Sequence, residues 1–305
     1  MHRLAILVCA LAPSLVLLQY GIAKARARWD DAMIWETYFA GGMAALLVLL
    51  PEHWLKQAIA NSLMSPVHGA AAEALFVAAA PEELAKFAML FFAIKRYGNG
   101  TNRHDMITLS FAVALGFAAI ENLGYLLLPG DWHFVALGRA GLSIPMHGLD
   151  GLAMGALLTA AGLSHHRGSW LSASLIVPIL LHAFFDFPLM LVARNQGFAG
   201  VLPAWLLLQV PMTIGILWWC NRMRVAAGPA YNQPDGSSNP RLVGIAMLLL
   251  APLLALTALL MGSNLGIAAA AMLILPSIFA IDLLWTAPKL VSSNSLSLGA
   301  DGHQP

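Results

Sequence analysis

Nine apolar runs, each long enough to cross a lipid bilayer, constrain this chain more than any other feature of its sequence. A helix needs about 20 mostly apolar residues to span the hydrocarbon core. Of the 305 residues, 59% are hydrophobic and 10% are charged, whereas soluble domains carry about 25% charged residues. The sequence therefore predicts an all-α, polytopic membrane helix bundle of about nine transmembrane helices. The predicted spans are residues 4–23, 33–51, 71–94, 106–128, 138–163, 170–192, 199–220, 242–261 and 265–286.

The basic residues between these runs fall mostly on one side of the predicted bilayer. Cytoplasmic connections carry an excess of Lys and Arg, so we expect the N-terminus outside and the C-terminus in the cytoplasm. The expected membrane is of the bacterial cytoplasmic (inner) type. The first run resembles a signal peptide, but a basic flank follows it without a clear cleavage site, and we expect it to be retained. The larger basic set is Lys24, Arg26, Arg28, Lys95, Arg96, Arg103, Arg167, Arg222, Arg224, Arg241 and Lys289, and the smaller one is Arg3, Lys56 and Arg194.

The distribution of polar residues divides the chain into four parts. Residues 1–70 hold two predicted N-terminal spans and a segment, 54–70, that is too polar to span and is expected at the interface or in a loop. Residues 71–192 form a predicted four-helix core that holds most of the ionisable groups inside apolar runs. Residues 193–286 supply three further spans, and the polar tail 287–305 is expected to be disordered.

Two adjacent carboxylates and an ammonium lie inside the third apolar run, at Glu82, Glu83 and Lys86. Ionisable residues within membrane segments are costly unless they face a wet or paired interior, and a functional role is their default interpretation. Glu82 and Lys86 are four residues apart and can neutralise each other on one helical face. This pairing leaves Glu83 without a basic partner.

The next three runs carry further polar side chains at a matching depth. At 1.5 Å per residue from each predicted cytoplasmic end, all of them lie roughly 17–24 Å deep, which unrelated polar residues on antiparallel helices would not do. We therefore expect one shared pocket. The residues are Glu121 and Asn122 on the fourth run, His147 and Asp150 on the fifth, and His182 and Asp186 on the sixth.

Spacing suggests how these side chains are oriented. His182 and Asp186 are four residues apart and share a helical face, so the carboxylate can orient the imidazole. Asp150 is a candidate hydrogen-bond acceptor for His147. Gly151 and Gly155 continue the spacing from His147 and form a glycine ridge that allows a neighbouring backbone to approach closely.

Each residue, taken alone, can also be explained by a purely structural role. A single membrane histidine is more often a packing residue, and Glu121 beside Asn122 can form an ordinary interhelical hydrogen bond. Arg139, at the edge of the fifth run, is expected to extend to the outer interface. The coincidence of depth favours a site over these separate explanations.

Two histidines and several carboxylates, without cysteine, suit a divalent metal, zinc above all, with a bound water. The candidate ligands are Glu83, Glu121, His147 and His182. A metal-free site, in which a glutamate activates water, is equally compatible with these residue types. The alternatives to peptide hydrolysis are a proton- or cation-coupled transporter that uses a carboxylate and histidine relay, and a non-catalytic membrane scaffold.

At these residues the sequence resembles the PrsW family of intramembrane proteases. That family has four short motifs on successive helices: EExxK, matched at Glu82 to Lys86; FxxxE, at Phe117 to Glu121; HxxxG, at His147 to Gly151; and an HxxxD-like motif, at His182 to Asp186. All four occur here in order. The resemblance covers roughly residues 71–192.

The resemblance implies an intramembrane endopeptidase that cleaves membrane-anchored substrates, one of them an anti-sigma factor, by attack of an activated water, and it implies no nucleic-acid partner. It also implies distant kinship with CAAX-processing membrane proteases, in which a histidine stands where this chain has Glu121. Glu83 would be the leading base or ligand, supported by Glu82 through Lys86. The expected site residues are Glu82, Glu83, Lys86, Glu121, His147, His182 and Asp186.

Overall fold

The computed structural model describes residues 2–24, 31–97, 105–128, 130, 132–227 and 275–283. Every regular element in these ranges is a helix, which confirms the predicted all-α fold for the described part of the chain. Residues 275–283 are helical as well. The elements are α1 (His2–Lys24), α2 (Asp31–Ala60), α3 (Pro66–Ala72), η1 (Glu73–Ala79), α4 (Ala80–Tyr97), α5 (Asp105–Leu127), α6 (Trp132–Gly138), η3 (Arg139–Ser143), α7 (Ile144–Leu163), α8 (Arg167–Arg194), η4 (Gln196–Val201) and α9 (Leu202–Ala226).

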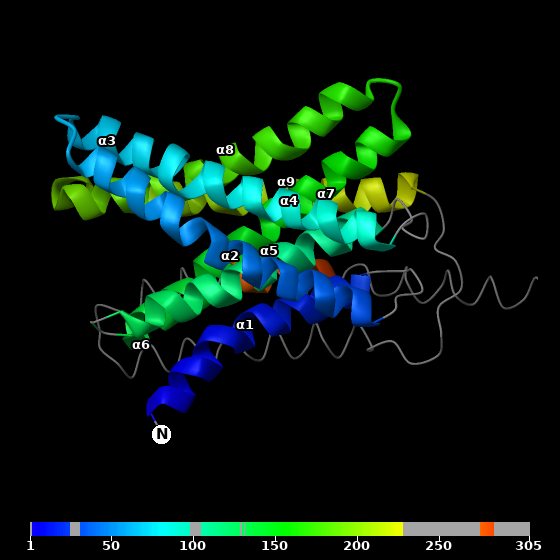
Figure 1. Ribbon diagram of the computed structural model, residues 1–305, viewed down its shortest axis with the longest axis horizontal. Coiled ribbons are helices and arrows are strands. Elements are labelled where there is room, and N and C mark those ends of the chain that lie inside the picture. Colours follow the sequence, from blue (N-terminus) through cyan, green and yellow to red (C-terminus); the bar gives the residue numbers. More distant parts are fainter. Residues whose placement is uncertain are drawn as a thin grey trace, which may run out of the picture.

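The long helices lie side by side along the long axis of the molecule, and α3 and α6 mark one of its ends (Figure 1). Four of the described helices are long and apolar enough to cross a membrane, and this is the pattern of an integral membrane protein. The number nine stays a prediction. The four segments are Arg3–Ile22, Ala32–Ala60, Met106–Leu127 and Arg167–Arg194.

Several helices extend beyond the predicted spans. The second span was expected to end at residue 51, but α2 continues through Pro51 to Ala60, because a proline removes only one backbone donor and membrane helices tolerate it. The fifth was expected to begin at residue 138, but helical backbone already begins at Trp132 and continues through α6 and η3 into α7.

The central helix is α5, which packs between α2 and α7. Gly41 of α2 lies against the main chain of α5, and Gly116 of α5 lies against the main chain of α2. On the other side, Gly151 and Gly155 of α7 lie against the main chain of α5, as the glycine ridge predicts. The three helices therefore form a tightly packed slab whose backbones touch.

A π-helical turn precedes each of two prolines near the polar residues. In η1 the Ala80 N–H bonds to the Leu75 carbonyl, and Pro81 follows directly. In η3 the Ile144 N–H bonds to the Arg139 carbonyl, and a proline again follows. Proline cannot donate to the preceding turn and crowds it, and a wider π turn relieves this crowding. Such turns are frequent at functional sites.

Part of the predicted organisation lies outside the described residues: the span 242–261, most of the span 265–286 and the tail 287–305. The helical residues 275–283 pack on the slab and on α1. The Phe279 ring lies 5.0 Å from the Tyr20 ring and 6.3 Å from the Phe111 ring, and the Tyr20 hydroxyl donates to Asp282 over 2.7 Å. The C-terminal part of the chain thus contributes to the core around α1 and α5.

Candidate active site

The three charged residues of α4 form the centre of a buried polar cluster. The Lys86 Nζ lies 2.7 Å from Glu83 Oε1 and 3.3 Å from Glu82 Oε2, and it also lies 4.0 Å from the centre of the Phe117 ring. All three charged side chains are buried. The predicted pair of Lys86 with Glu82 forms. The prediction that Glu83 lacks a basic partner is wrong, because carboxylates at both i−3 and i−4 share a helical face with the lysine.

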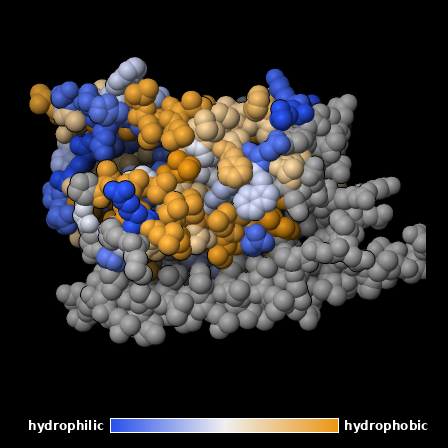
Figure 2. Space-filling model, turned by 60° about the horizontal axis from the view of Figure 1, so that its bottom comes forward, coloured by the Kyte–Doolittle hydropathy of each residue, from blue (hydrophilic) through white to orange (hydrophobic). Residues whose placement is uncertain are grey.

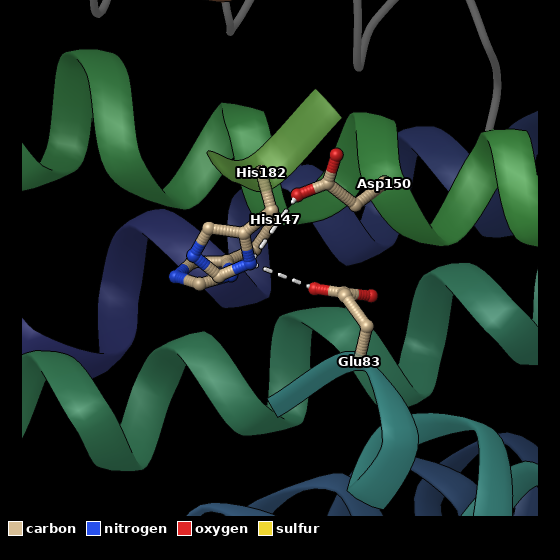
Figure 3. Close-up of side chains that lie close together, drawn as sticks. All are labelled: Glu83, His147, Asp150 and His182. Atoms are coloured by element: carbon tan, nitrogen blue, oxygen red, sulfur yellow. Dashed lines mark hydrogen bonds and ion pairs between the residues drawn. The ribbon is translucent and has the colours of Figure 1, made fainter. Parts of the chain in front are cut away.

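His182 of α8 reaches the same centre. Its Nδ1 lies 2.9 Å from Glu83 Oε1, and its Nε2 lies 3.3 Å from Asp186 Oδ2, so the predicted contact between His182 and Asp186 forms. Asp150 of α7 is 3.9 Å from the same Nδ1. In Figure 3 the His182 ring faces the carboxyl groups of both Glu83 and Asp150.

His147 of α7 lies beside His182, with ring centres 5.1 Å apart and ring planes at 83°. Its Nε2 is 2.7 Å from Glu121 Oε2 of α5, and its Nδ1 is 3.0 Å from Lys86 Nζ. The prediction that Asp150 accepts a hydrogen bond from His147 is wrong. One helical turn separates the two residues, but the Asp150 carboxyl group faces His182 instead.

The two histidines are oriented in the same way. In each ring Nε2 lies beside an outer carboxylate, that of Glu121 or that of Asp186, and Nδ1 faces the central groups of α4. A carboxylate beside one ring nitrogen fixes the tautomer and leaves the other nitrogen to bind a partner, as in carboxylate–histidine–metal arrangements.

Arg139 belongs to this cluster, whereas the sequence predicts that it extends to the outer interface. Its Nη2 lies 2.6 Å from Glu121 Oε2, and its guanidinium stacks 4.1 Å from the centre of the Tyr125 ring. Only 12% of its side chain is exposed. The expectation is wrong because η3 is helical and turns Arg139 towards α5. A charge inside an apolar stretch, the criterion that singled out Glu82, would have found Arg139 too.

Glu52 of α2 is a second residue that sequence reasoning missed. Its carboxyl group is close enough to Glu82 and Glu121 to interact electrostatically with both. One of its oxygens is buried, without a hydrogen-bond partner among the described residues. The sequence carries this carboxylate, but the predicted span ends at residue 51 and the predicted interfacial segment begins at residue 54, so Glu52 belonged to neither.

The cluster opens towards one end of the molecule. The side chains of Glu121 and Asp186 are 20% and 19% exposed, whereas Glu83, Lys86 and His182 are buried. Glu121 and Asp186 lie in the halves of α5 and α8 that lead to the end with α3 and α6. Hydrophilic side chains gather at that end, and hydrophobic ones cover much of the remaining coloured surface (Figure 2). Water therefore has access from the side of Glu121 and Asp186.

The donor set fits a divalent metal ion. Glu83, His147, Asp150 and His182 each offer one ligand atom, all within 4.8 Å of one another, whereas Glu121 falls into a second group with Glu82 and His147. Glu83 Oε2 and Asp150 Oδ1 are buried and lack hydrogen-bond partners among the described residues. Nitrogen and carboxylate ligands in such a set suit zinc.

The balance of charge points the same way. Five carboxyl groups surround the two histidines, whereas the fixed cations in contact with them are Lys86 and Arg139. Buried charges are stable only when they are paired or coordinate a metal. A bound cation would therefore balance the remaining negative charge of the cluster.

Replacing Lys86 by Met should destabilise the protein strongly. The substitution keeps the length of the side chain but leaves Glu82 and Glu83 without their shared ammonium, and breaking a buried ion pair costs about 3–5 kcal/mol. We expect a clearly lower midpoint of thermal unfolding in detergent. The control is Lys95→Met, on the exposed end of the same helix, which should change the midpoint little. Equal midpoints for the two variants would contradict this prediction.

Comparison with known proteins identifies the family of the chain. Residues 31–216 match the model of the PrsW family intramembrane metalloprotease. Protease PrsW of Halalkalibacterium halodurans is 30% identical over 218 residues, which cover 70% of this chain and 92% of the relative. Protease PrsW of Bacillus subtilis is 28% identical over 221 residues, 70% of this chain and 91% of the relative. No solved structure gives a significant match.

The match contains α2 to α8, most of α9 and every residue of the polar cluster. It does not favour the alternative of a coupled transporter. A protease of this kind acts on membrane protein substrates, and the apolar helices agree with an integral membrane location. The chain belongs to the PrsW family of intramembrane metalloproteases and is an intramembrane peptidase.

Proposed function

We propose that this protease hydrolyses the peptide bond at the cluster of Glu82, Glu83, His147, Asp150 and His182. The observation that carries the proposal is the common orientation of the two histidines. Each has an outer carboxylate at Nε2 and turns Nδ1 to the centre. The two histidines and the carboxylates of Glu83 and Asp150 then each offer a ligand atom, all within 4.8 Å of one another, and such a donor set can support metal-assisted hydrolysis.

The residues that would hold the metal, zinc by preference, are His147 and His182, together with the carboxylates of Glu83 and Asp150. A metal at His147 Nδ1 would replace the contact of 3.0 Å between this nitrogen and Lys86 Nζ, and Lys86 would keep its ion pairs with Glu82 and Glu83. When bound, the metal would supply Lewis-acid polarisation of the scissile carbonyl and of the attacking water. Glu121 and Asp186 would hold the two imidazole rings in place from behind.

Glu82 is the carboxylate left over for proton transfer. Its Oε2 lies 3.3 Å from Lys86 Nζ and 3.9 Å from His182 Nε2, so it borders the centre without occupying it. In the proposed reaction Glu82 accepts the proton that the water loses as its oxygen bonds to the carbonyl carbon. It then delivers this proton to the leaving amine nitrogen when the C–N bond breaks. Lys86 holds Glu82 and Glu83 beside each other through its contacts with both carboxyl groups.

The proposed substrate is a membrane-anchored protein similar to an anti-sigma factor, cut on the side of the membrane to which Glu121 and Asp186 open.

We place the enzyme in a bacterial inner membrane, with nine spans, an external N-terminus and a catalytic core over residues 71–192. The basic connections support this orientation. Reporter fusions after residues 97 and 227 should report a cytoplasmic location, and fusions after residue 130 an external one.

A distant relation to CAAX-processing membrane proteases is proposed as well. It is supported by the paired glutamates, Glu82 and Glu83, at the start of α4. Where those proteases have a further histidine, this chain has Glu121, which contacts His147.

Metal analysis of the purified protein tests the proposed mechanism. Wild type should hold about one zinc per chain, as a four-donor site predicts, and His182→Ala should lose it. Asp186→Asn should retain the site with about 10–100-fold weaker affinity, because it disturbs only the outer carboxylate. His133→Ala, outside the cluster, is the control. If chelation leaves cleavage unchanged and His182→Ala does not alter metal content, the metal-assisted mechanism is wrong.

A further inference from the structure

A proline in α1 exposes a backbone acceptor to the active-site helix α5. Pro13 lies inside α1 and has no N–H, so the carbonyl four residues earlier, that of Cys9, lacks its usual helical donor. The Asn122 side chain takes this place. Its Nδ2 lies 3.4 Å from the Cys9 carbonyl oxygen and 3.0 Å from that of Ala10. The first helix is thereby anchored to the residue next to Glu121.

This anchor determines which way the Asn122 amide faces. Because its NH₂ group donates to backbone carbonyls, its Oδ1 must point away from α1, and it accepts a hydrogen bond of 3.0 Å from Arg139 Nε. The Asn122 side chain is fully buried, so no bulk water competes for these contacts. The position of the Arg139 guanidinium is fixed by Asn122 on one edge and by the Tyr125 ring on one face.

The fixed guanidinium in turn constrains Glu121 and His147. Arg139 Nη2 forms an ion pair with Glu121 Oε2 at 2.6 Å, and the same oxygen lies 2.7 Å from His147 Nε2. A carboxylate held by arginine is a permanent acceptor, so Nε2 must carry the proton of the imidazole ring. His147 Nδ1 then carries the lone pair of the ring, and it accepts a hydrogen bond of 3.0 Å from Lys86 Nζ.

We propose that Arg139 is a positioning residue of the protease, held by Asn122 and through it by α1, and that it fixes Glu121 and the tautomer of His147. This inference rests on the proposed roles of Glu121 and His147 in hydrolysis. It gives α1 a function as well, although α1 lies before the region, 31–216, that matches the family. The outer end of this contact chain is the backbone carbonyl that Pro13 leaves free.

An ordinary structural ion pair is the competing explanation, and a matched pair of arginines separates the two. Arg194 of α8 also forms an ion pair between helical segments, with Glu73 at 2.9 Å and with 28% of its side chain exposed, but this pair lies outside the polar cluster. Arg139→Met and Arg194→Met each remove one such pair. Only the former should affect catalysis.

The first measurement is the cleavage rate of a membrane-anchored reporter in proteoliposomes. Arg139→Met should lower kcat about 10–100-fold, the usual range for residues behind metal-binding histidines, with little change in KM. Arg139→Lys should recover part of this loss, since lysine can pair with Glu121 but cannot contact Asn122 at the same time. Arg194→Met should keep wild-type kcat. Equal kcat for Arg139→Met and Arg194→Met would overturn the proposal.

The second measurement reads the His147 ring directly, by nitrogen NMR of histidine-labelled protein with the signal assigned through His147→Gln. In wild type Nε2 should carry the proton, and Arg139→Met should produce a mixture of tautomers. Pro13→Ala, which restores a donor to the Cys9 carbonyl, should lower kcat only about 2–5-fold through the same route, below the 10–100-fold range, because Asn122 keeps its hydrogen bond to the Ala10 carbonyl. A proton on Nδ1 in wild type, or an unchanged His147 spectrum in Arg139→Met, would refute the role of Arg139.

These outcomes remain distinct from a failure of the proposed hydrolysis. If Glu83→Gln still cleaves the reporter, the proposed active site itself is wrong. If Glu83→Gln is inactive while Arg139→Met retains full kcat, the active site stands and only the positioning role of Arg139 is refuted.

Discussion

Glu83→Gln should abolish cleavage of a membrane-anchored reporter while the protein stays inserted in the membrane. Glu83 Oε1 contacts both Lys86 Nζ at 2.7 Å and His182 Nδ1 at 2.9 Å, so it links the two halves of the cluster. Glutamine fills the same volume but carries no charge, and it can neither bind a metal as a carboxylate nor accept a proton. We expect a fall in kcat of more than about 10²-fold, because the loss of a proposed metal ligand should exceed the 10–100-fold effect of removing an outer partner of such a ligand.

The matched control is Glu36→Gln. Glu36 of α2 also forms an ion pair with a basic residue of another helix, Arg96 of α4, at 3.3 Å. Both side chains are about half exposed. Arg96 lies at the far end of α4 from Glu83. Cleavage by this variant should equal that of wild type. Cleavage is measured in proteoliposomes at equal amounts of folded protein, as judged by size-exclusion chromatography. Wild-type cleavage by Glu83→Gln would exclude the proposed site.

Gly116→Ala should have the largest effect on folding. A Cβ at this position collides with the backbone carbonyl of Tyr38 in α2, and no side-chain rotation can relieve a clash with main chain. The helices would have to move apart along a contact that Gly41 makes equally close from the other side. Overpacking a core commonly costs 1–3 kcal/mol, and for a backbone clash we expect more than about 3 kcal/mol. The yield of folded protein in detergent should fall sharply.

Gly124→Ala provides the comparison within the same helix. A Cβ at Gly124 meets nothing within 4 Å, and alanine is the better helix former. Its yield and its midpoint of thermal unfolding should match or exceed those of wild type. If Gly116→Ala folds as well as Gly124→Ala, α2 and α5 do not pack as closely as described.

The convergence of the polar residues could be predicted from the sequence because it depends on few variables. A membrane helix has a fixed rise per residue, so the depth of Glu83, Glu121, His147 and His182 follows from simple counting. Side chains four residues apart must share a face, which gave the contact between His182 and Asp186. The glycine ridge on α7 followed from the same spacing.

The exact partners within the cluster could not be predicted in this way. Angles around a helix change where a π turn inserts a residue, and η1 and η3 do so directly before Glu82 and before His147. Within α7, spacing alone does not tell which neighbouring helix the Asp150 carboxyl group faces. Arg139 was misjudged because helical backbone begins at Trp132, so Arg139 lies inside the helical segment and not at its edge. Lys86 satisfies two carboxylates at once because its flexible chain reaches both, which pairwise spacing rules do not anticipate.

The glycine contacts of α2, α5 and α7 also determine how a substrate can reach the scissile position. Where main chains touch, no side chain can swing aside, so these three helices cannot part to admit a polypeptide from the lipid. The helix α8, which carries His182, makes no such main-chain contact through a glycine among the described residues, and large apolar side chains such as Ile176, Leu180 and Phe184 are exposed along it. Of the described walls around the reaction centre, α8 is therefore one that an entering substrate could displace.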